Sequence, residues 1–368
     1  MNKKILAVAT AALLTGAIGV QAAPTVYGRI DLSIDAIDSA ANGTDDINMN
    51  SNTSMIGMKG SEDLGDGLKA IYKIEIQIDA SERDKNQIDR DQWVGLKGNF
   101  GQVRMGTISS SYKSHGAAID PLYRTSAQGR SWGLQSKLHS GAGEVGGRMN
   151  KHIRFDSNNY NGVKVTADYS FDASDSDGTQ GNDTFGVGAS YKNGPVMVFT
   201  DYLSSNDGGD DSVWKIGGKF NAMEGLTFYG QYESDGGLIS NSKEACVNVQ
   251  SGACTSSAVA AATPYIADGV GPAVAAQGAI TKASANDVSG ADVWYLGASM
   301  ALGNTTVVFN LGQGDDNDHN QNVGYKSWTL AAAHKLSKRT MVYGGFVQQD
   351  FDATGETDVV TFGMRHNF

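Results

Sequence analysis

The feature that most limits the fold of this chain is a two-residue alternation of apolar and polar side chains. In residues 68–78, leucine, tyrosine and isoleucine occupy one face, while lysine, glutamate and glutamine occupy most of the other. Such alternation is typical of β-strands that have one apolar and one polar environment. The pattern returns in residues 26–34, 163–171, 185–191, 214–220, 226–232, 294–302 and 328–336.

These segments are long for strands. Soluble proteins usually have strands of about five or six residues, whereas a tilted strand that crosses a bilayer needs about 9–11. Aromatic residues stand near the ends of the apolar faces, where rings would meet the lipid interfaces. They are Tyr191, Trp214, Phe220, Trp294 and Trp328. Because lipid offers no hydrogen bonds to a sheet edge, we expect an all-β fold, a closed transmembrane antiparallel β-barrel, with a secreted soluble β-protein as the alternative.

Composition excludes other classes. Glycine supplies 47 of 368 residues, which is about twice its usual share and disfavours helix. The mean hydropathy of −0.30 argues against a bundle of membrane helices. The net charge of −11 argues against a nucleic-acid partner, because binding to phosphates needs a basic surface.

The N-terminal residues predict export. Lys3 and Lys4 precede an apolar run over residues 5–20, and small residues follow at the position where a signal peptidase cleaves. We therefore expect a signal peptide over residues 1–22 and a barrel domain over residues 23–368. An N-terminal membrane anchor is the alternative interpretation.

Turn signals divide the chain into sixteen expected strands, with fourteen or eighteen left open. Short breaks and long breaks alternate, as they do when a barrel has turns at one end and loops at the other. The short breaks are residues 61–67, 99–101, 193–195 and 337–339. The long breaks are residues 109–147, 173–182, 205–210, 235–288, 314–322 and 352–356.

Several ordered motifs resemble the general diffusion porins of Gram-negative outer membranes. They are Thr25–Asp31 (TVYGRID), Ile56–Ala70, Val94–Gly106, Ile153–Ser157 and the ending Gly363–Phe368. The resemblance covers both ends and the first half of the chain well, but not residues 235–288. It implies a sixteen-stranded homotrimeric barrel in which the third extracellular loop folds inward and faces basic residues on the wall.

The function that this resemblance implies is passive diffusion of small hydrophilic solutes and ions across the outer membrane. The implied partners are membrane lipid, lipopolysaccharide and the outer-membrane assembly machinery, without a cofactor. A substrate-specific porin is one alternative, in which Tyr112, Tyr123 and Trp132 stack against a solute. A surface adhesin or phage receptor that uses residues 235–288 is another. No catalytic constellation is visible, so we do not expect an enzyme.

The candidate constriction loop is residues 109–147, because a loop this long without periodicity is usually functional or disordered. Its charges are Lys113, Arg124, Arg130 and Lys137 against Asp120 and Glu144. Asp120 and Glu144 are the candidates for an acidic side of the constriction. The alternative is that both carboxylates cap turns or form local pairs.

The basic side of the constriction is expected on the wall. The family's motif positions indicate Arg90 and Arg148, with solvated arginines at strand ends as the alternative. By strand parity, Arg154, Arg29 and Lys73 also face the lumen, and Lys59 shares a strand with a motif position.

One departure from the family puts the selectivity in doubt. Met55 stands where the family often has an arginine. A weak anion preference is the hypothesis that the basic loop and the basic wall support, because charges in a water-filled pore select ions.

Three further residues have expected roles. Cys246 and Cys254 are expected to form a disulfide in an oxidising compartment, with free thiols or metal ligands as alternatives. Phe368 falls on the apolar face of the last strand and, by the resemblance, is also a signal for outer-membrane assembly. The acidic runs at residues 172–183 and 315–318 are expected to be solvated loop tips, and no metal site is expected.

Overall fold

The computed structural model of the protein describes residues 23–40, 43–82, 90–140, 142–143, 147–171, 183–205, 211–241, 289–318 and 324–368. The expected signal peptide, Glu144 and both cysteines lie outside these described residues, as does most of the segment 235–288.

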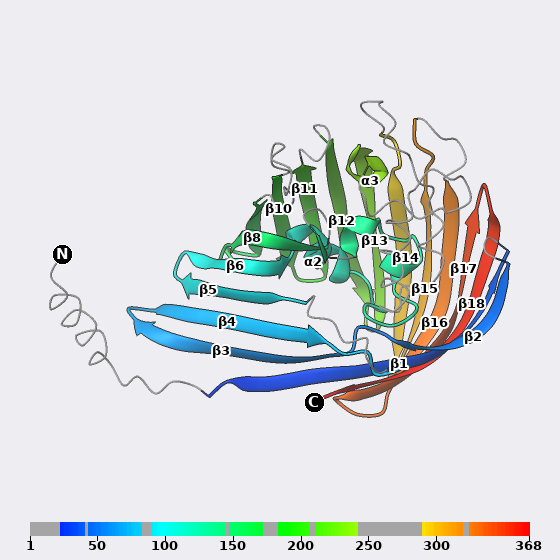
Figure 1. Ribbon diagram of the computed structural model, residues 1–368, viewed down its shortest axis with the longest axis horizontal. Helices are drawn as coiled ribbons and strands as arrows, with labels where there is room; N and C mark the ends of the chain where they lie inside the picture. Colours follow the sequence, from blue (N-terminus) through cyan, green and yellow to red (C-terminus); the bar gives the residue numbers. More distant parts are fainter. Residues whose placement is uncertain are drawn as a thin grey trace, which may run out of the picture.

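The described residues form one sheet of eighteen strands (Figure 1). The first nine are β1 (Thr25–Ser39), β2 (Thr44–Ser51), β3 (Met55–Gly65), β4 (Leu68–Gln77), β5 (Gln92–Gly98), β6 (Gly101–Ser109), β7 (Ala142–Gly143), β8 (Arg148–Asp156) and β9 (Val163–Ser170). The others are β10 (Thr184–Asn193), β11 (Val196–Ser205), β12 (Asp211–Met223), β13 (Leu226–Gly236), β14 (Val293–Leu302), β15 (Thr305–Gly314), β16 (Tyr325–Lys335), β17 (Thr340–Phe351) and β18 (Gly355–Asn367).

The sheet closes into a barrel because its first and last strands pair. β1 pairs with β18 along its length from Arg29 to Ser39. Its other edge pairs first with β3 and then with β2, so β2 and β3 act as one strand that is interrupted near Thr53, where φ is +58°. The two-residue β7 lies in a loop, and the wall therefore has the sixteen strands that the sequence predicted.

The two faces of the wall have the reverse exposure of those in a soluble protein, because apolar side chains are exposed on the outside and polar side chains are buried inside. On β1, Ile30 and Ile34 are 44% and 50% exposed, whereas Asp31 and Ser33 are 0% and 2% exposed. The same reversal continues on β11, where Tyr202 is exposed and Asp201 is buried. An exposed apolar surface around a buried polar interior suits a wall that lies in lipid. The predicted alternation is therefore confirmed.

The connections alternate in length as predicted, although one predicted turn is too wide. β3 continues to Gly65, so residues 61–65 belong to a strand and only Asp66 and Gly67 turn. Their φ values are +51° and +78°, which suits the Asp-Gly turns that join twisted strands. Residues 61–65 remain in the strand, although most of them are polar, because their backbone continues to pair with β4.

The predicted long loop runs between β6 and β8 and has its own structure. It contains α2 (Ser111–Ala117), η1 (Gly129–Ser131) and η2 (Lys137–His139), and a fourth helix, α3 (Leu238–Asn241), follows β13. Figure 1 draws α2 within the curve of the sheet. None of the helices in the described parts of the chain is long and apolar enough to cross a membrane.

Candidate functional site

Several groups of hydrogen bonds attach the loop between β6 and β8, residues 110–147, to the polar face of the wall, and three of them are the main attachments. The first lies on β12 and β13, where Glu233 accepts hydrogen bonds from the Tyr112 hydroxyl (2.6 Å) and from the Ser136 backbone N–H (2.9 Å). The Lys215 ammonium donates to the Tyr112 carbonyl (2.5 Å) and lies 3.1 Å from His139 Nε2. All five residues are buried, so these bonds are shielded from water.

The ring of His139 is neutral in this first attachment. Burial lowers the pKa of His139 well below its usual value, and the nearby Lys215 ammonium lowers it further. The ring Nδ1 lies 3.0 Å from the Ser136 carbonyl and donates to it, which leaves Nε2 to accept from Lys215. One contact between the loop and the wall is therefore the hydrogen bond from Lys215 to Nε2 of a neutral His139 that carries its proton on Nδ1.

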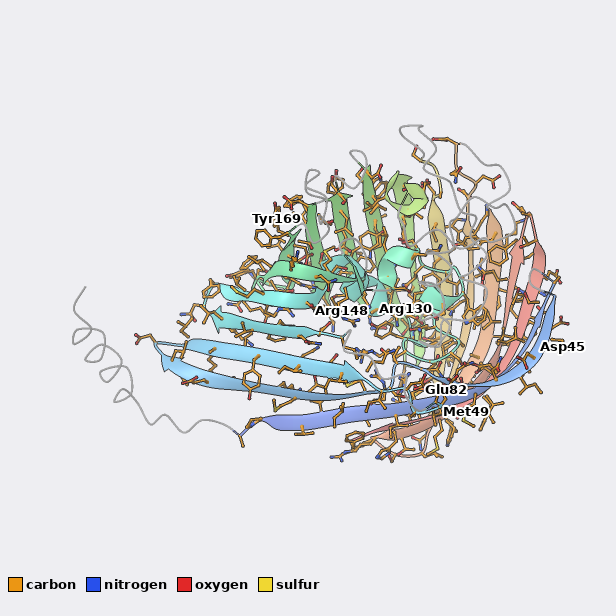
Figure 2. The ribbon with its side chains drawn as sticks, viewed as in Figure 1. Asp45, Met49, Glu82, Arg130, Arg148 and Tyr169 are labelled. Carbon is orange, nitrogen blue, oxygen red and sulfur yellow. The ribbon has the colours of Figure 1, made fainter. Side chains whose placement is uncertain are left out.

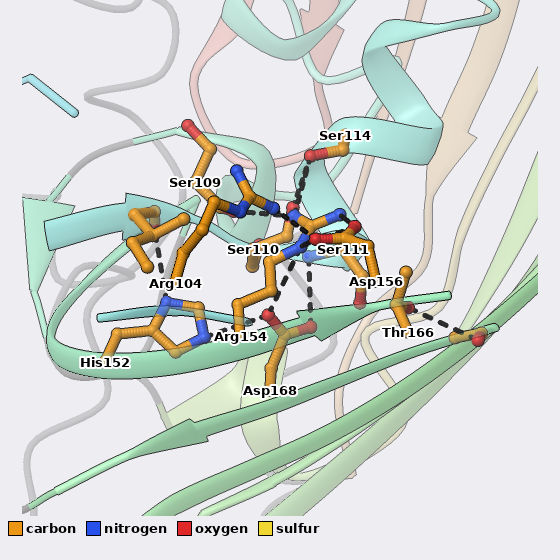
Figure 3. Close-up of polar contacts among 12 residues, drawn as sticks. Arg104, Ser109, Ser110, Ser111, Ser114, His152, Arg154, Asp156, Thr166 and Asp168 are labelled. Atoms are coloured by element: carbon orange, nitrogen blue, oxygen red, sulfur yellow. Dashed lines mark hydrogen bonds and ion pairs between the residues drawn. The ribbon is translucent and has the colours of Figure 1, made fainter. Parts of the chain in front are cut away.

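The second attachment fixes the start of α2 (Figure 3). Arg154 on β8 donates to the Ser109 carbonyl (2.7 Å) and to Ser114 Oγ (3.1 Å). Asp168 on β9 accepts from the Ser111 backbone N–H (3.1 Å). The first N–H groups of a helix have no partner within the helix, and the helix dipole makes that end positive. The Asp168 carboxylate therefore binds α2 at the end that attracts an anion most strongly.

The third attachment lies near β16 and β18. Ser126 Oγ and Thr361 Oγ1 are 2.5 Å apart, and the Tyr325 hydroxyl donates to the Gly133 carbonyl (2.7 Å). Gly133 has a φ of +73°, and an added Cβ would lie 2.3 Å from the Tyr325 ring. Only glycine fits this close approach.

Three of the predicted basic residues share two carboxylates. Lys73 Nζ lies 3.1 Å from Glu75 and 2.8 Å from Asp91. Arg148 Nε lies 2.9 Å from Asp91, and Arg90 Nε lies 3.4 Å from Glu75. The structure therefore brings Lys73, Arg90 and Arg148 together, but with acidic partners that the sequence analysis did not foresee.

Two arginines lie over the ring of Tyr123, and two more act on it through their charge. The guanidinium carbons of Arg124 and Arg130 lie 5.1 Å and 5.2 Å from the centre of its ring. Burial raises the pKa of Tyr123, but Arg130, Arg124, Arg90 and Arg148 outweigh it and lower the pKa to about 8. Figure 2 labels Arg130 and Arg148 near the loop. Sequence reasoning missed the surroundings of Tyr123, because Arg90 precedes β5 and Arg148 begins β8, both outside the loop that carries the tyrosine.

The other predicted basic residues have other hydrogen-bond or ring partners. Arg154 belongs to the second attachment. Arg29 on β1 is buried, and its guanidinium donates to the Thr53 carbonyl (2.5 Å). Lys59 Nζ lies 5.0 Å from the ring centre of Tyr27. Met55 is buried on the inner face opposite Arg29.

Asp120 organises the loop itself. Its two oxygens accept from the backbone N–H groups of Leu122 and Gly129, each at 2.9 Å. Burial raises the pKa of Asp120 to about 6, against the lowering effect of these two bonds. This geometry matches the turn-capping alternative. An acidic role in the constriction stays a prediction for Asp120 and for Glu144.

Phe368 completes the contact between the two ends of the barrel. It exchanges two backbone hydrogen bonds of 3.0 Å with Gly28, and its ring is exposed on the outer surface. An added Cβ at Gly28 would lie 2.2 Å from this ring, so the glycine makes room for it. Within the described residues, no group of three or more His, Cys, Asp or Glu is placed to hold a metal ion.

Two relatives match by sequence over a little more than half of their length. The major outer membrane protein P.IB of Neisseria meningitidis serogroup B is 30% identical over 207 residues, which are 54% of this chain and 57% of that protein. The outer membrane porin protein 32 of Delftia acidovorans is 29% identical over 206 residues, 54% of this chain and 58% of that protein.

Solved structures share the fold. The anion-selective porin from Comamonas acidovorans superposes with a TM-score of 0.70 at 22% identity, over 94% of this chain and 99% of that one. The trimer form of OmpT from Vibrio cholerae gives 0.63 at 11% identity, over 94% and 100%.

A family profile described as Gram-negative porin matches residues 7–354. With this match over nearly the whole chain and a closed barrel with an apolar outside, the chain belongs to the Gram-negative porin family and is a β-barrel protein of the outer membrane.

Proposed function

We propose that this protein is a water-filled channel for passive diffusion of small hydrophilic solutes and ions. The observation that carries the proposal is the reversed wall, in which apolar side chains face outward while charged and amide side chains face a closed interior. Such an interior holds water and lets polar solutes avoid the hydrocarbon. The loop of residues 110–147, attached to this polar face, forms the constriction. We infer a channel rather than an enzyme.

We further propose a weak preference for anions. Arg124 and Arg130 lie over the ring of Tyr123, Arg90 and Arg148 add their positive charge to that region, and Asp120 turns both of its oxygens toward loop N–H groups. Positive charge at the narrowest part of a pore with low-dielectric walls attracts anions and repels cations. The barrel also resembles a solved porin that is described as anion-selective.

A homotrimer is the proposed assembly, because a trimer form is among the solved barrels that superpose on this chain. Membrane lipid, lipopolysaccharide and the outer-membrane assembly machinery are the proposed partners, with Phe368 as the residue that the machinery reads. Chemical cross-linking of the protein in detergent should yield species up to trimers and none larger.

Planar-bilayer recording of the refolded mature protein tests the channel and its selectivity together. We expect stepwise conductance, and in a salt gradient a reversal potential whose sign indicates anion preference. A protein that leaves the bilayer without conductance contradicts the channel. A reversal potential of the opposite sign contradicts only the anion preference.

The burial of two aromatic side chains argues against the substrate-specific alternative. Tyr112 and Trp132 are 0% and 2% exposed and pack within the loop's contacts to the wall, so neither ring is available to a solute. Tyr123 alone is partly exposed, with its ring flanked by two guanidinium groups. The adhesin alternative concerns residues that lie mostly outside the described part of the chain.

A further inference from the structure

The cations near Tyr123 differ in how far carboxylates neutralise them. On the wall, Lys73, Arg90 and Arg148 lie within 3.4 Å of Glu75 or Asp91. Two carboxylates thus offset two of the three positive charges, and the remaining charge of +1 is shared by the group. A paired charge acts on a passing ion as a dipole, whose field falls off faster than that of a single charge.

Arg124 is different. Within the described part of the chain it makes no ion pair with a carboxylate. The residue is partly exposed, while its Nε is buried without a hydrogen-bond partner. Its neighbour Arg365, which donates to the Tyr123 carbonyl (3.3 Å), is by contrast paired with Asp31 at 2.5 Å. Arg124 therefore presents a whole positive charge next to water.

The loop holds Arg124 in a defined position. Its backbone is left-handed, with a φ of +72°, a conformation that is uncommon outside glycine. The Gln128 side-chain oxygen accepts from the Arg124 backbone N–H (2.9 Å) and from Arg130 Nε (2.9 Å), so one buried amide fixes both arginines. The guanidinium lies over the Tyr123 ring at 5.1 Å, which adds a cation–π contact.

We propose that Arg124, carried by the loop rather than by the wall, is the residue that sets the ion selectivity of the channel. The inference rests on the proposed anion preference and assigns it to one side chain. Arg90 and Arg148 then act mainly with Glu75 and Asp91, as paired groups that hold the wall side of the constriction. Gln128 is a positioning residue, because it touches Arg124 and not the passing ion.

The first experiment removes the charge. Arg124→Gln should lower the anion-to-cation permeability ratio about sixteenfold, because a unit charge about 5 Å from an ion in water favours an anion about fourfold and disfavours a cation about fourfold. Arg124→Lys should keep the wild-type ratio. Arg339→Gln is the matched control, because it removes an arginine from the exposed turn between β16 and β17. An unchanged ratio in Arg124→Gln overturns the inference, even when the wild type prefers anions.

The second experiment changes the charge in a channel that has already folded. Arg124→Cys is recorded before and after a thiosulfonate reagent that attaches either a positive or a negative group, with the wild type under the same reagents as the control. The positive group should restore the anion preference, and the negative group should shift the reversal potential toward cation preference. Equal responses to both groups overturn the inference. Wild-type protein that prefers cations overturns the proposed anion preference and the inference with it.

Discussion

At the scale of single residues, the environment of a side chain decides its role more than its type does. Asp120 carries a charge that could face a pore, but two backbone N–H groups of the loop hold it. Arg154 follows the predicted parity into the interior, yet it binds Ser109 and Ser114 of the loop. Parity predicts the face on which a residue lies, but not the partner that it meets there.

Tyr123 should make the ion selectivity depend on pH. Its pKa of about 8 lies below the ordinary value of 10, so the phenol loses its proton as the pH rises through 8. The phenolate then offsets one positive charge beside Arg124 and Arg130, and the anion-to-cation permeability ratio should fall between pH 7 and pH 9. Reversal potentials at the two pH values measure this change.

Tyr123→Phe is the control for the pH effect, because it keeps the ring and removes the ionisable hydroxyl. Its selectivity should stay the same over this pH range. A wild-type ratio that does not change, or a Tyr123→Phe channel that changes as much as the wild type, would show that another group titrates.

Asp120→Ala should loosen the loop. The backbone N–H groups of Leu122 and Gly129 would lose their acceptor, and a buried N–H without a partner costs about 1–3 kcal/mol. We expect a noisier open channel and faster cleavage of the loop by added protease. Asp315→Ala, at an exposed position after β15, is the control that should leave both readouts unchanged.

At the scale of elements, the loop of residues 110–147 forms a unit that the wall holds by polar bonds and by apolar contacts, as where Ile119 and Leu134 share a buried cluster with Phe199, Tyr229 and Tyr295 of the wall. Its own apolar side chains, among them Ile119, Leu122, Leu134 and Leu138, are buried. It lies between β6, which ends at Ser109, and β8, which begins at Arg148. The three helices inside it were not predicted, because short helices depend on tertiary contacts and have little periodicity.

Lys215→Met should release part of this unit. Lys215 is fully buried, donates to the Tyr112 carbonyl and lies 3.5 Å from Asp201, so its loss leaves a buried carboxylate less neutralised. Breaking a buried ion pair costs about 3–5 kcal/mol. We expect the barrel to form, but with a higher and less steady single-channel conductance than the wild type.

Lys192→Met, at an exposed position near the turn between β10 and β11, is the matched control and should conduct like the wild type. A steady, unchanged conductance in Lys215→Met would show that the other two attachments hold the loop without this one.

At the scale of the whole molecule, closure of the sheet separates two environments. Every wall strand has two neighbours, so no row of backbone groups is left to face lipid. β1 joins β18, and the exchange of bonds between Gly28 and Phe368 extends that seam to the last residue. The outer surface can then be apolar throughout without exposing an unpaired edge.

Ile34→Arg should impair barrel formation in lipid. Ile34 is half exposed on the outer face and pairs with Phe362 and Met49 of the neighbouring strands. An arginine on the lipid face costs about 2–4 kcal/mol at the bilayer midplane but only about 0–1 near the interface. Leu64→Arg, beside the turn at residues 66–67, is the control that should fold like the wild type. The folded fraction can be read from the heat-dependent gel mobility.

The sequence alone determined the barrel, because few folds in lipid accommodate a two-residue alternation of apolar and polar side chains over long segments. From that alternation and the turn signals, the sequence predicted sixteen strands, the two faces of each strand and the position of the long loop. The tertiary structure alone decided the site. Arg90 and Arg148 act on Tyr123 only after β4 has paired with β5, β6 has paired with β8 and the loop has attached to the wall. Strand periodicity records which side of a sheet a residue faces, whereas ion pairs depend on distances between segments that lie far apart in the chain.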